Sequence, residues 1–137
     1  MDEITVFIHT EIRSTESETK VARAVSNIFG DVKPIISQGL KSKVLKVELN
    51  GRESLFRFRD LLMLDRIRDA TRKALLKRIS GKKIRFFLNK QVAFANHISL
   101  SEEVSESPLG PILVEINYEK PESLVNWLAP KKVKSGE

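Results

Sequence analysis

GRESLFRFRDLLMLDRIRDATRKALLKRISGKKIRFFLNK, residues 51–90, is the most informative segment of this chain. From Arg52 to Lys90 it holds thirteen Lys and Arg against four acids, a net charge of +9, whereas the whole chain carries +6. The positive charge is therefore concentrated in one place. The same segment has apolar residues first at helical and then at strand spacing, which indicates a folded segment rather than a loose basic tail.

Two helices, or one kinked helix, are expected over residues 54–79, with Ser54 and Asp65 as candidate caps. Their core-facing stripes comprise Leu55, Phe58, Leu61 and Leu62, and then Ile67, Ala70, Thr71, Ala74 and Leu75. At about 100° per residue, Arg66, Lys73 and Lys77 fall within roughly forty degrees on the opposite side. A strand over 82–89 follows, with Ile84, Phe86 and Leu88 on one face.

Residues 3–12 alternate and predict a central strand, since Phe7 and His9 add bulk to the second face. Thr15 and Glu18 have the spacing of a capping box, which predicts a helix from there to Phe29. Strands are expected over 31–37, 43–49 and 91–100, with Lys90 in a tight connection before the last of these. A loop over 101–107, a strand over 112–118 and a helix over 121–128 complete the pattern.

The expected order is β-α-β-β-α-α-β-β-β-α, in which few connections suit a parallel βαβ unit. The prediction is an α+β fold, a mostly antiparallel sheet with helices packed on one face. Residues 1–130 are expected to form a single domain, and residues 131–137 a flexible basic tail.

The composition narrows the classes of function. Cysteine is absent, which excludes disulfides, thiolate catalysis and cysteine-ligated zinc. There is no apolar run near the roughly 20 residues that span a bilayer, and no signal-peptide pattern at the start, so a cytoplasmic location is expected. The sequence pI of about 9.7 favours a polyanionic partner such as RNA.

Four motifs together resemble the archaeal uncharacterised protein family two-zero-one, which is grouped with predicted RNA-binding proteins. They are DRIRDATRKALL (65–76), LNKQVAFA (88–95), SPLGPI (107–112) and PESLVNWLAP (121–130). The resemblance covers nearly the whole chain. It implies an archaeal source, a cytoplasmic location and an α+β fold similar to that of large-subunit ribosomal protein five, and it supplies no catalytic residues.

The basic segment predicts a surface that binds RNA phosphates, because phosphate binding needs several cations held together. The predicted contacts are Arg66, Lys73, Lys77, Lys82, Lys83, Arg85 and Lys90. The alternative is a solvated face stabilised by pairs such as Asp69 with Lys73, yet four acids cannot pair thirteen bases locally. Phe87 shares a strand face with Lys83 and Arg85, where it would either stack on a base or belong to the core or an interface.

No catalytic constellation is recognisable, so a non-enzymatic protein without cofactor is predicted. His9 and His97 with Glu11 could bind a metal only if their strands pair, and ordinary sheet-surface histidines are the simpler interpretation. The alternative function is a protein-interaction module or homodimeric structural subunit with an acidic partner. Phe7 and Phe87, expected on an outer sheet face, would form the contact surface of such a module. As an RNA-binding protein, the chain could also be part of a ribonucleoprotein.

Overall fold

The computed structural model describes residues 3–101 and 110–131. The strands are β1 (Thr5–Ile12), β2 (Ile35–Gln38), β3 (Lys43–Asn50), β4 (Ile79–Ser80), β5 (Lys83–Asn89), β6 (Leu100–Ser101) and β7 (Pro111–Asn117). The helices are α1 (Glu18–Phe29), α2 (Phe56–Leu64), α3 (Arg68–Leu76), α4 (Lys90–Phe94) and α5 (Pro121–Leu128), and the short 3-10 helix η1 covers Arg52–Leu55.

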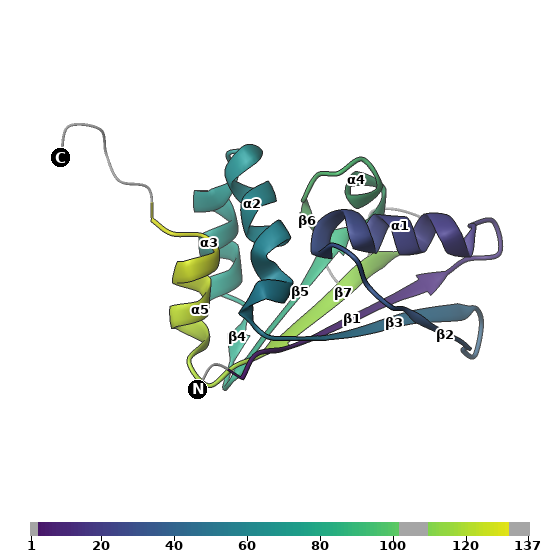
Figure 1. The fold of residues 1–137 in the computed structure, drawn as a ribbon, viewed down its shortest axis with the longest axis horizontal. Helices are drawn as coiled ribbons and strands as arrows, with labels where there is room; N and C mark the ends of the chain where they lie inside the picture. Colours follow the sequence, from purple (N-terminus) through teal and green to yellow (C-terminus); the bar gives the residue numbers. More distant parts are fainter. Residues whose placement is uncertain (1–2, 102–109, 132–137) are drawn as a thin grey trace.

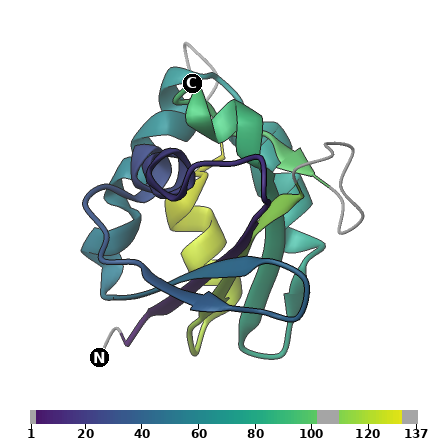
Figure 2. The ribbon, with the colours of Figure 1, turned by 90° about the vertical axis from the view of Figure 1, so that its right-hand side faces the viewer.

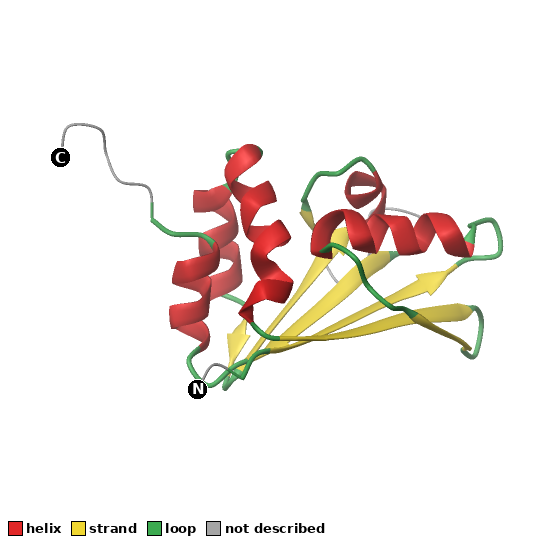
Figure 3. Cartoon of the chain, in the orientation of Figure 1, coloured by secondary structure: helices red, strands yellow, loops and turns green. Residues whose placement is uncertain are grey.

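All described strand pairs are antiparallel, in the order β2-β3-β1-β7-β5-β4. β4 and β6 pair with the two ends of β5, on the side away from β7. Every helix lies on the same face of this sheet (Figures 1 and 3). Seen from the end, the sheet curves from β2 and β3 round to β5, and the helices lie on its concave side (Figure 2). The predicted α+β fold is therefore confirmed.

β1 occupies the centre of the sheet because it pairs with β3 on one side and β7 on the other. Its residues alternate as predicted: Val6 and Ile8 are buried under the helices, whereas Phe7 is 39% exposed on the opposite face. The face of the sheet away from the helices is not covered by any described helix or strand (Figure 1).

Three phenylalanines join the helices to the sheet. The ring of Phe58 on α2 stacks on Phe29 of α1 and packs against Phe86 of β5, with both centroid distances 5.8 Å. Phe58 and Phe86 are at most 1% exposed. Because the three rings come from separate elements, they fix α1 and α2 against the sheet.

The cap of α1 differs from the prediction. Ser17, not Thr15, is the N-cap residue, and its Oγ accepts a hydrogen bond from the Lys20 amide at 3.4 Å. Glu16 takes the other local donor, since its Oε1 accepts from the Arg13 amide at 2.9 Å. The helix ends at Phe29 as expected, followed by Gly30 with a φ of 84°.

The basic segment forms two helices, α2 and α3, as predicted. Neither Ser54 nor Asp65 is the N-cap residue of a helix, however. The hydroxyl of Ser54 donates to the Gly51 carbonyl at 2.7 Å, one turn before α2. Asp65 is the C-cap of α2 rather than the N-cap of α3. Leu55, Phe58, Leu61, Leu62, Thr71 and Leu75 form the buried stripe, while Ala70 is exposed.

The predicted strand over 91–100 is wrong. Asn89 caps the short helix α4, because its Oδ1 accepts from the Val92 amide at 3.0 Å. Only Leu100–Ser101 returns to the sheet as β6. The predicted loop over 101–107 falls, after Ser101, outside the described residues, as does the tail beyond Lys131.

Candidate nucleic-acid interface

Helix α3 presents two of the predicted phosphate contacts. Thr71 and Leu75 are buried and fix the inner side of the helix. Lys73 and Lys77 are four residues apart on the exposed side, and Lys77 is the C-cap residue. Within the described part of the chain, neither lysine makes a hydrogen bond or an ion pair, and Asp69 does not pair with Lys73. The Asp69–Lys73 pair that the solvated-face alternative invoked is therefore not formed.

Arg66 lies in the turn before α3, where its φ is +57°. A residue with this left-handed backbone is not part of the helical row that the sequence predicted for Arg66, Lys73 and Lys77. Its side chain borders a hollow formed with Met63, Arg68 and Asp69. Arg66 is thus exposed just before α3, whereas Lys77 caps the other end of this nine-residue helix, which is about 14 Å long.

β4 and β5 continue the basic surface around the edge of the sheet. Helix α3 leads into β4, and Lys82 and Lys83 follow in the turn and at the start of β5. Both are exposed. Arg85 projects from the sheet face away from the helices, and its guanidinium carbon lies 5.9 Å from the centroid of Phe87. Five cations therefore follow one another from α3 to β5.

Phe87 is on the outer face but is only 8% exposed. A role in the core or in an interface agrees with this burial, whereas stacking on an RNA base does not. Arg85 covers part of its ring.

Lys90 does not belong to this surface. It is 3% exposed, and its Nζ donates to the Glu11 carbonyl at 2.7 Å and to Glu16 Oε1 at 3.1 Å. Burial lowers the pKa of Lys90, and the hydrogen bond with Glu16 opposes that shift. The prediction that Lys90 contacts phosphate is corrected, because its ammonium group joins α4 to the end of β1 and the segment before α1.

Other arginines of the basic segment connect helices. Arg57 Nε donates to the Asn27 carbonyl at 2.6 Å, and Arg59 Nε to the Trp127 carbonyl at 2.8 Å. Arg72 binds Asn126 Oδ1 through two nitrogens, at 3.0 and 3.1 Å. Sequence reasoning left these three arginines out of the predicted contacts, but it did not identify their structural role. Their partners are 30 or more residues away, so no local pattern could identify them.

The two histidines have different surroundings and different partners. His97 Nδ1 is 3.0 Å from Asp65 Oδ1, in the segment after α4 rather than on a strand. His9 faces outward from β1 beside Lys46. Partial burial lowers the pKa of His9, and the positive charge of Lys46 lowers it further. Among residues 3–101 and 110–131, no cluster of His, Asp and Glu is arranged to hold a metal ion.

Residues 5–118 match a family described as RNA binding. The chain belongs to this family. Among its relatives, a UPF0201 protein of Sulfurisphaera tokodaii is 40% identical over 129 residues, which cover 94% of this chain and 89% of the relative. A second, from Sulfolobus acidocaldarius, has the same identity and coverage. The resemblance inferred from the four motifs is confirmed.

Solved structures of UPF0201 proteins have a similar fold. The crystal structure of a UPF0201 protein is 35% identical, with a TM-score of 0.79, and the match covers 93% of this chain and 94% of that one. The UPF0201 protein of Methanococcus jannaschii is 25% identical, with a TM-score of 0.81 and coverage of 92% and 99%. In the described ranges of our chain, no helix is long and apolar enough to cross a membrane.

Proposed function

We propose that this protein binds RNA by contacting backbone phosphates through a surface that runs along α3 and around the β4–β5 edge. We name it the phosphate interface. Its residues are Arg66, Lys73, Lys77, Lys82, Lys83 and Arg85. The observation that carries the proposal is the exposure of all six cations without an acidic partner among the described residues, in a chain whose family is described as RNA binding.

Electrostatics favours this function over a merely solvated surface. Each cation that neutralises a phosphate releases condensed counterions, and this release supplies much of the free energy of binding. Cations already held by carboxylates would gain less, because binding would first have to break the ion pair. Lys73, Lys77 and Lys82 make no such pair with any described residue.

The arrangement suits backbone recognition. The cations come from successive elements, from the turn before α3 through α3 and the β4–β5 turn to the outer face of β5. Contacts of this kind position a nucleic acid but carry no direct sequence information. We therefore expect the interface to select RNA by shape, and the proposal assigns no reaction to it.

A charge-reversal experiment tests the proposal. Binding of a structured RNA at low salt is compared between the wild type and a variant with four interface lysines changed to Glu, namely Lys73, Lys77, Lys82 and Lys83. The matched control reverses four exposed cations on α1, in the segment after it and in the β2–β3 turn, namely Lys20, Arg23, Lys33 and Lys41. Both variants have the same net charge, so general electrostatics affects them equally.

The interface variant should lose most of its affinity, and the control should retain most of it. Equal loss in both variants would mean that only net charge matters. Absence of wild-type binding at low salt would refute the proposed function. Circular dichroism of each variant confirms that it is folded.

A second candidate function is a homodimer formed through the outer sheet face. The observation that favours it is the exposure of Phe7 and Ile35 on elements that no helix covers, at 39% and 71%. Phe87, the other aromatic considered for this role, is already buried. Light scattering of the pure protein distinguishes the candidates: a dimer disrupted by Phe7→Ser, with RNA binding absent, would favour the second.

A further inference from the structure

Trp127, the only tryptophan of the chain, is the centre of an aromatic cluster outside the phosphate interface. The guanidinium carbon of Arg52 lies 4.8 Å from its ring centroid, and that of Arg59 lies 5.2 Å away. Arg59 also donates to the Trp127 carbonyl at 2.8 Å. These contacts hold the indole between η1, α2 and α5, so its position is preorganised.

Phe56 lies on the outside of this cluster. Its ring centroid is 5.9 Å from that of Trp127, at an interplanar angle of 49°. The packing of α2 is satisfied by Phe58, Leu61 and Leu62, and Phe56 remains 53% exposed. An aromatic ring held against a fixed indole, with half of its surface in solvent, offers a flat apolar face to a ligand.

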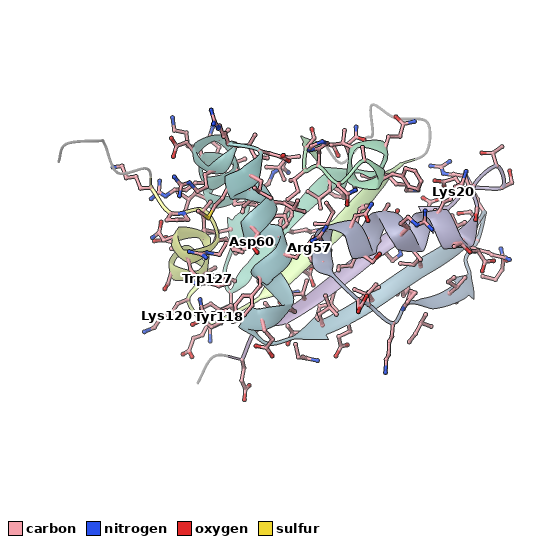
Figure 4. All side chains as sticks on the ribbon, turned by 45° about the horizontal axis from the view of Figure 1, so that its top comes forward. Lys20, Arg57, Asp60, Tyr118, Lys120 and Trp127 are labelled. Atoms are coloured by element: carbon pink, nitrogen blue, oxygen red, sulfur yellow. The ribbon has the colours of Figure 1, made fainter. Side chains whose placement is uncertain are left out.

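The cluster is continuous with the phosphate interface. Arg52 Nη2 donates to Tyr118 Oη at 3.3 Å, and the Tyr118 amide donates to the Lys82 carbonyl at 3.0 Å. A hollow at this junction is lined by Lys82, Asn117 and Tyr118, and also by Thr5 and the two acids Glu3 and Glu119. Figure 4 shows Tyr118, Trp127 and Lys120 close together at the α5 end of the molecule.

We propose that this cluster, which we name the stacking site, binds an unpaired base of the RNA by stacking it on Phe56. The inference rests on the proposed function and specifies its ligand: an RNA with a single-stranded segment next to the phosphates held by Lys82 and Lys83. Aromatic side chains beside a basic groove are the usual means of holding single-stranded nucleic acid.

The charges around Phe56 agree with a base rather than a phosphate as its ligand. Glu53 and Asp60 are exposed within about one helical turn of Phe56 on either side. These carboxylates would repel a phosphate placed directly on the ring, whereas a neutral base can approach it. In this proposal the backbone of the neighbouring nucleotides reaches toward Lys82, beyond Tyr118.

The position of Trp127 makes the inference directly measurable. Since the chain has one tryptophan, its fluorescence reports on the stacking site alone. Oligouridylate of about ten nucleotides, within the usual site size of such proteins, is titrated into the full chain. Trp127 emission should change with the same midpoint as binding measured by anisotropy of labelled oligonucleotide.

Phe56→Ala should weaken binding of oligouridylate by about fivefold to one hundredfold, the range measured for removal of one stacking aromatic. It should leave the affinity for a blunt-ended RNA duplex unchanged, because bases inside a duplex cannot stack on the ring. Phe94→Ala is the matched control. Phe94 is also an exposed phenylalanine, at 42%, but lies on α4 beside α1.

The possible failures are distinct. If Phe56→Ala and Phe94→Ala bind oligouridylate like the wild type, the stacking site is refuted and the phosphate interface stands. If neither RNA binds any of the proteins, the proposed function and this inference both fall. If Phe56→Ala alters only the oligomeric state, the cluster is a contact between copies of the chain and the inference is wrong.

Discussion

At the scale of single residues, a cation's partners decide whether it is available to a ligand. Lys83 and Lys90 belong to the same basic segment of the sequence. In the structure, Lys90 is buried against Glu16, whereas Lys83 is exposed. Asn89 caps α4, so Lys90 is the first residue of a helix, and its ammonium group reaches Glu16. The residue types alone could not show this, because Val92, Phe94 and Ile98 also alternate as in a strand.

The buried pair makes Lys90 a test of structure rather than of binding. Lys90→Met should reduce the free energy of unfolding by about 3–5 kcal/mol, since it leaves Glu16 as a buried charge without its partner. The double variant Lys90→Met/Glu16→Gln should recover part of this loss, because the Gln side chain can still accept from the Arg13 amide. Urea unfolding of the three proteins measures it. A loss below about 1 kcal/mol for Lys90→Met would contradict the burial of the pair.

His9 predicts a pH dependence of stability. Burial, and then the charge of Lys46, lowers the pKa of His9 below 6.5 in the folded protein. Between that lowered pKa and 6.5 the unfolded chain binds more protons, so stability rises with pH across this window and falls as the solution is acidified.

The experiment uses His97→Gln as the background, which leaves His9 as the only histidine of the chain. Adding His9→Gln should flatten the dependence of the unfolding free energy on pH in that window. An unchanged slope would show that other groups cause it. Urea unfolding at a series of pH values below 7 provides the measurement.

At the scale of elements, short-range patterns predicted most helices and strands correctly. The alternation of β1 and the apolar stripes of α1 and α2 reappear as buried residues, because side-chain periodicity follows directly from backbone geometry. Sequence patterns gave the wrong answer where one residue spacing fits two local structures. Thr15 and Glu18 have the spacing of a capping box, but Glu16 binds Arg13 and Lys90, so the helix begins two residues later.

This difference in caps can be measured. Ser17→Ala should reduce the free energy of unfolding by about 1 kcal/mol, because the Lys20 amide loses its hydrogen-bond acceptor at the start of α1. Thr15→Ala is the matched control and should have a much smaller effect. The reverse order of the two effects, in chemical denaturation, would place the cap at Thr15.

At the scale of the whole molecule, the sequence predicted a surface of seven cations, but not the distant partners of Lys90 or of the other basic residues. Concentrated charge required exposure somewhere, since so many cations cannot be buried. Which cations join helices depends on distant partners, as with Arg57 and Asn27 or Arg59 and Trp127. The aromatic residues of the proposed stacking site come from α2, α5 and the residue after β7. No local sequence pattern could therefore predict that they lie together.

The fold also explains how a basic segment that helps build the core can serve a second purpose. Helices α2 and α3 bury one side in the core, and the exposed side of α3 continues into the β4–β5 edge. The phosphate interface therefore rests on regular elements rather than on a flexible tail. We expect its cations to be held in place before RNA arrives, which reduces the entropy that binding would cost.

The salt dependence of RNA binding tests the phosphate interface most directly. The logarithm of the association constant is measured against the logarithm of salt concentration for the wild type and for a variant with four lysines neutralised to Gln, namely Lys73, Lys77, Lys82 and Lys83. Each lost phosphate contact should reduce the slope by about 0.7–0.9, so the variant's slope should be shallower by about 3. Equal slopes for the two proteins would contradict the account, since these lysines would then release no counterions on binding.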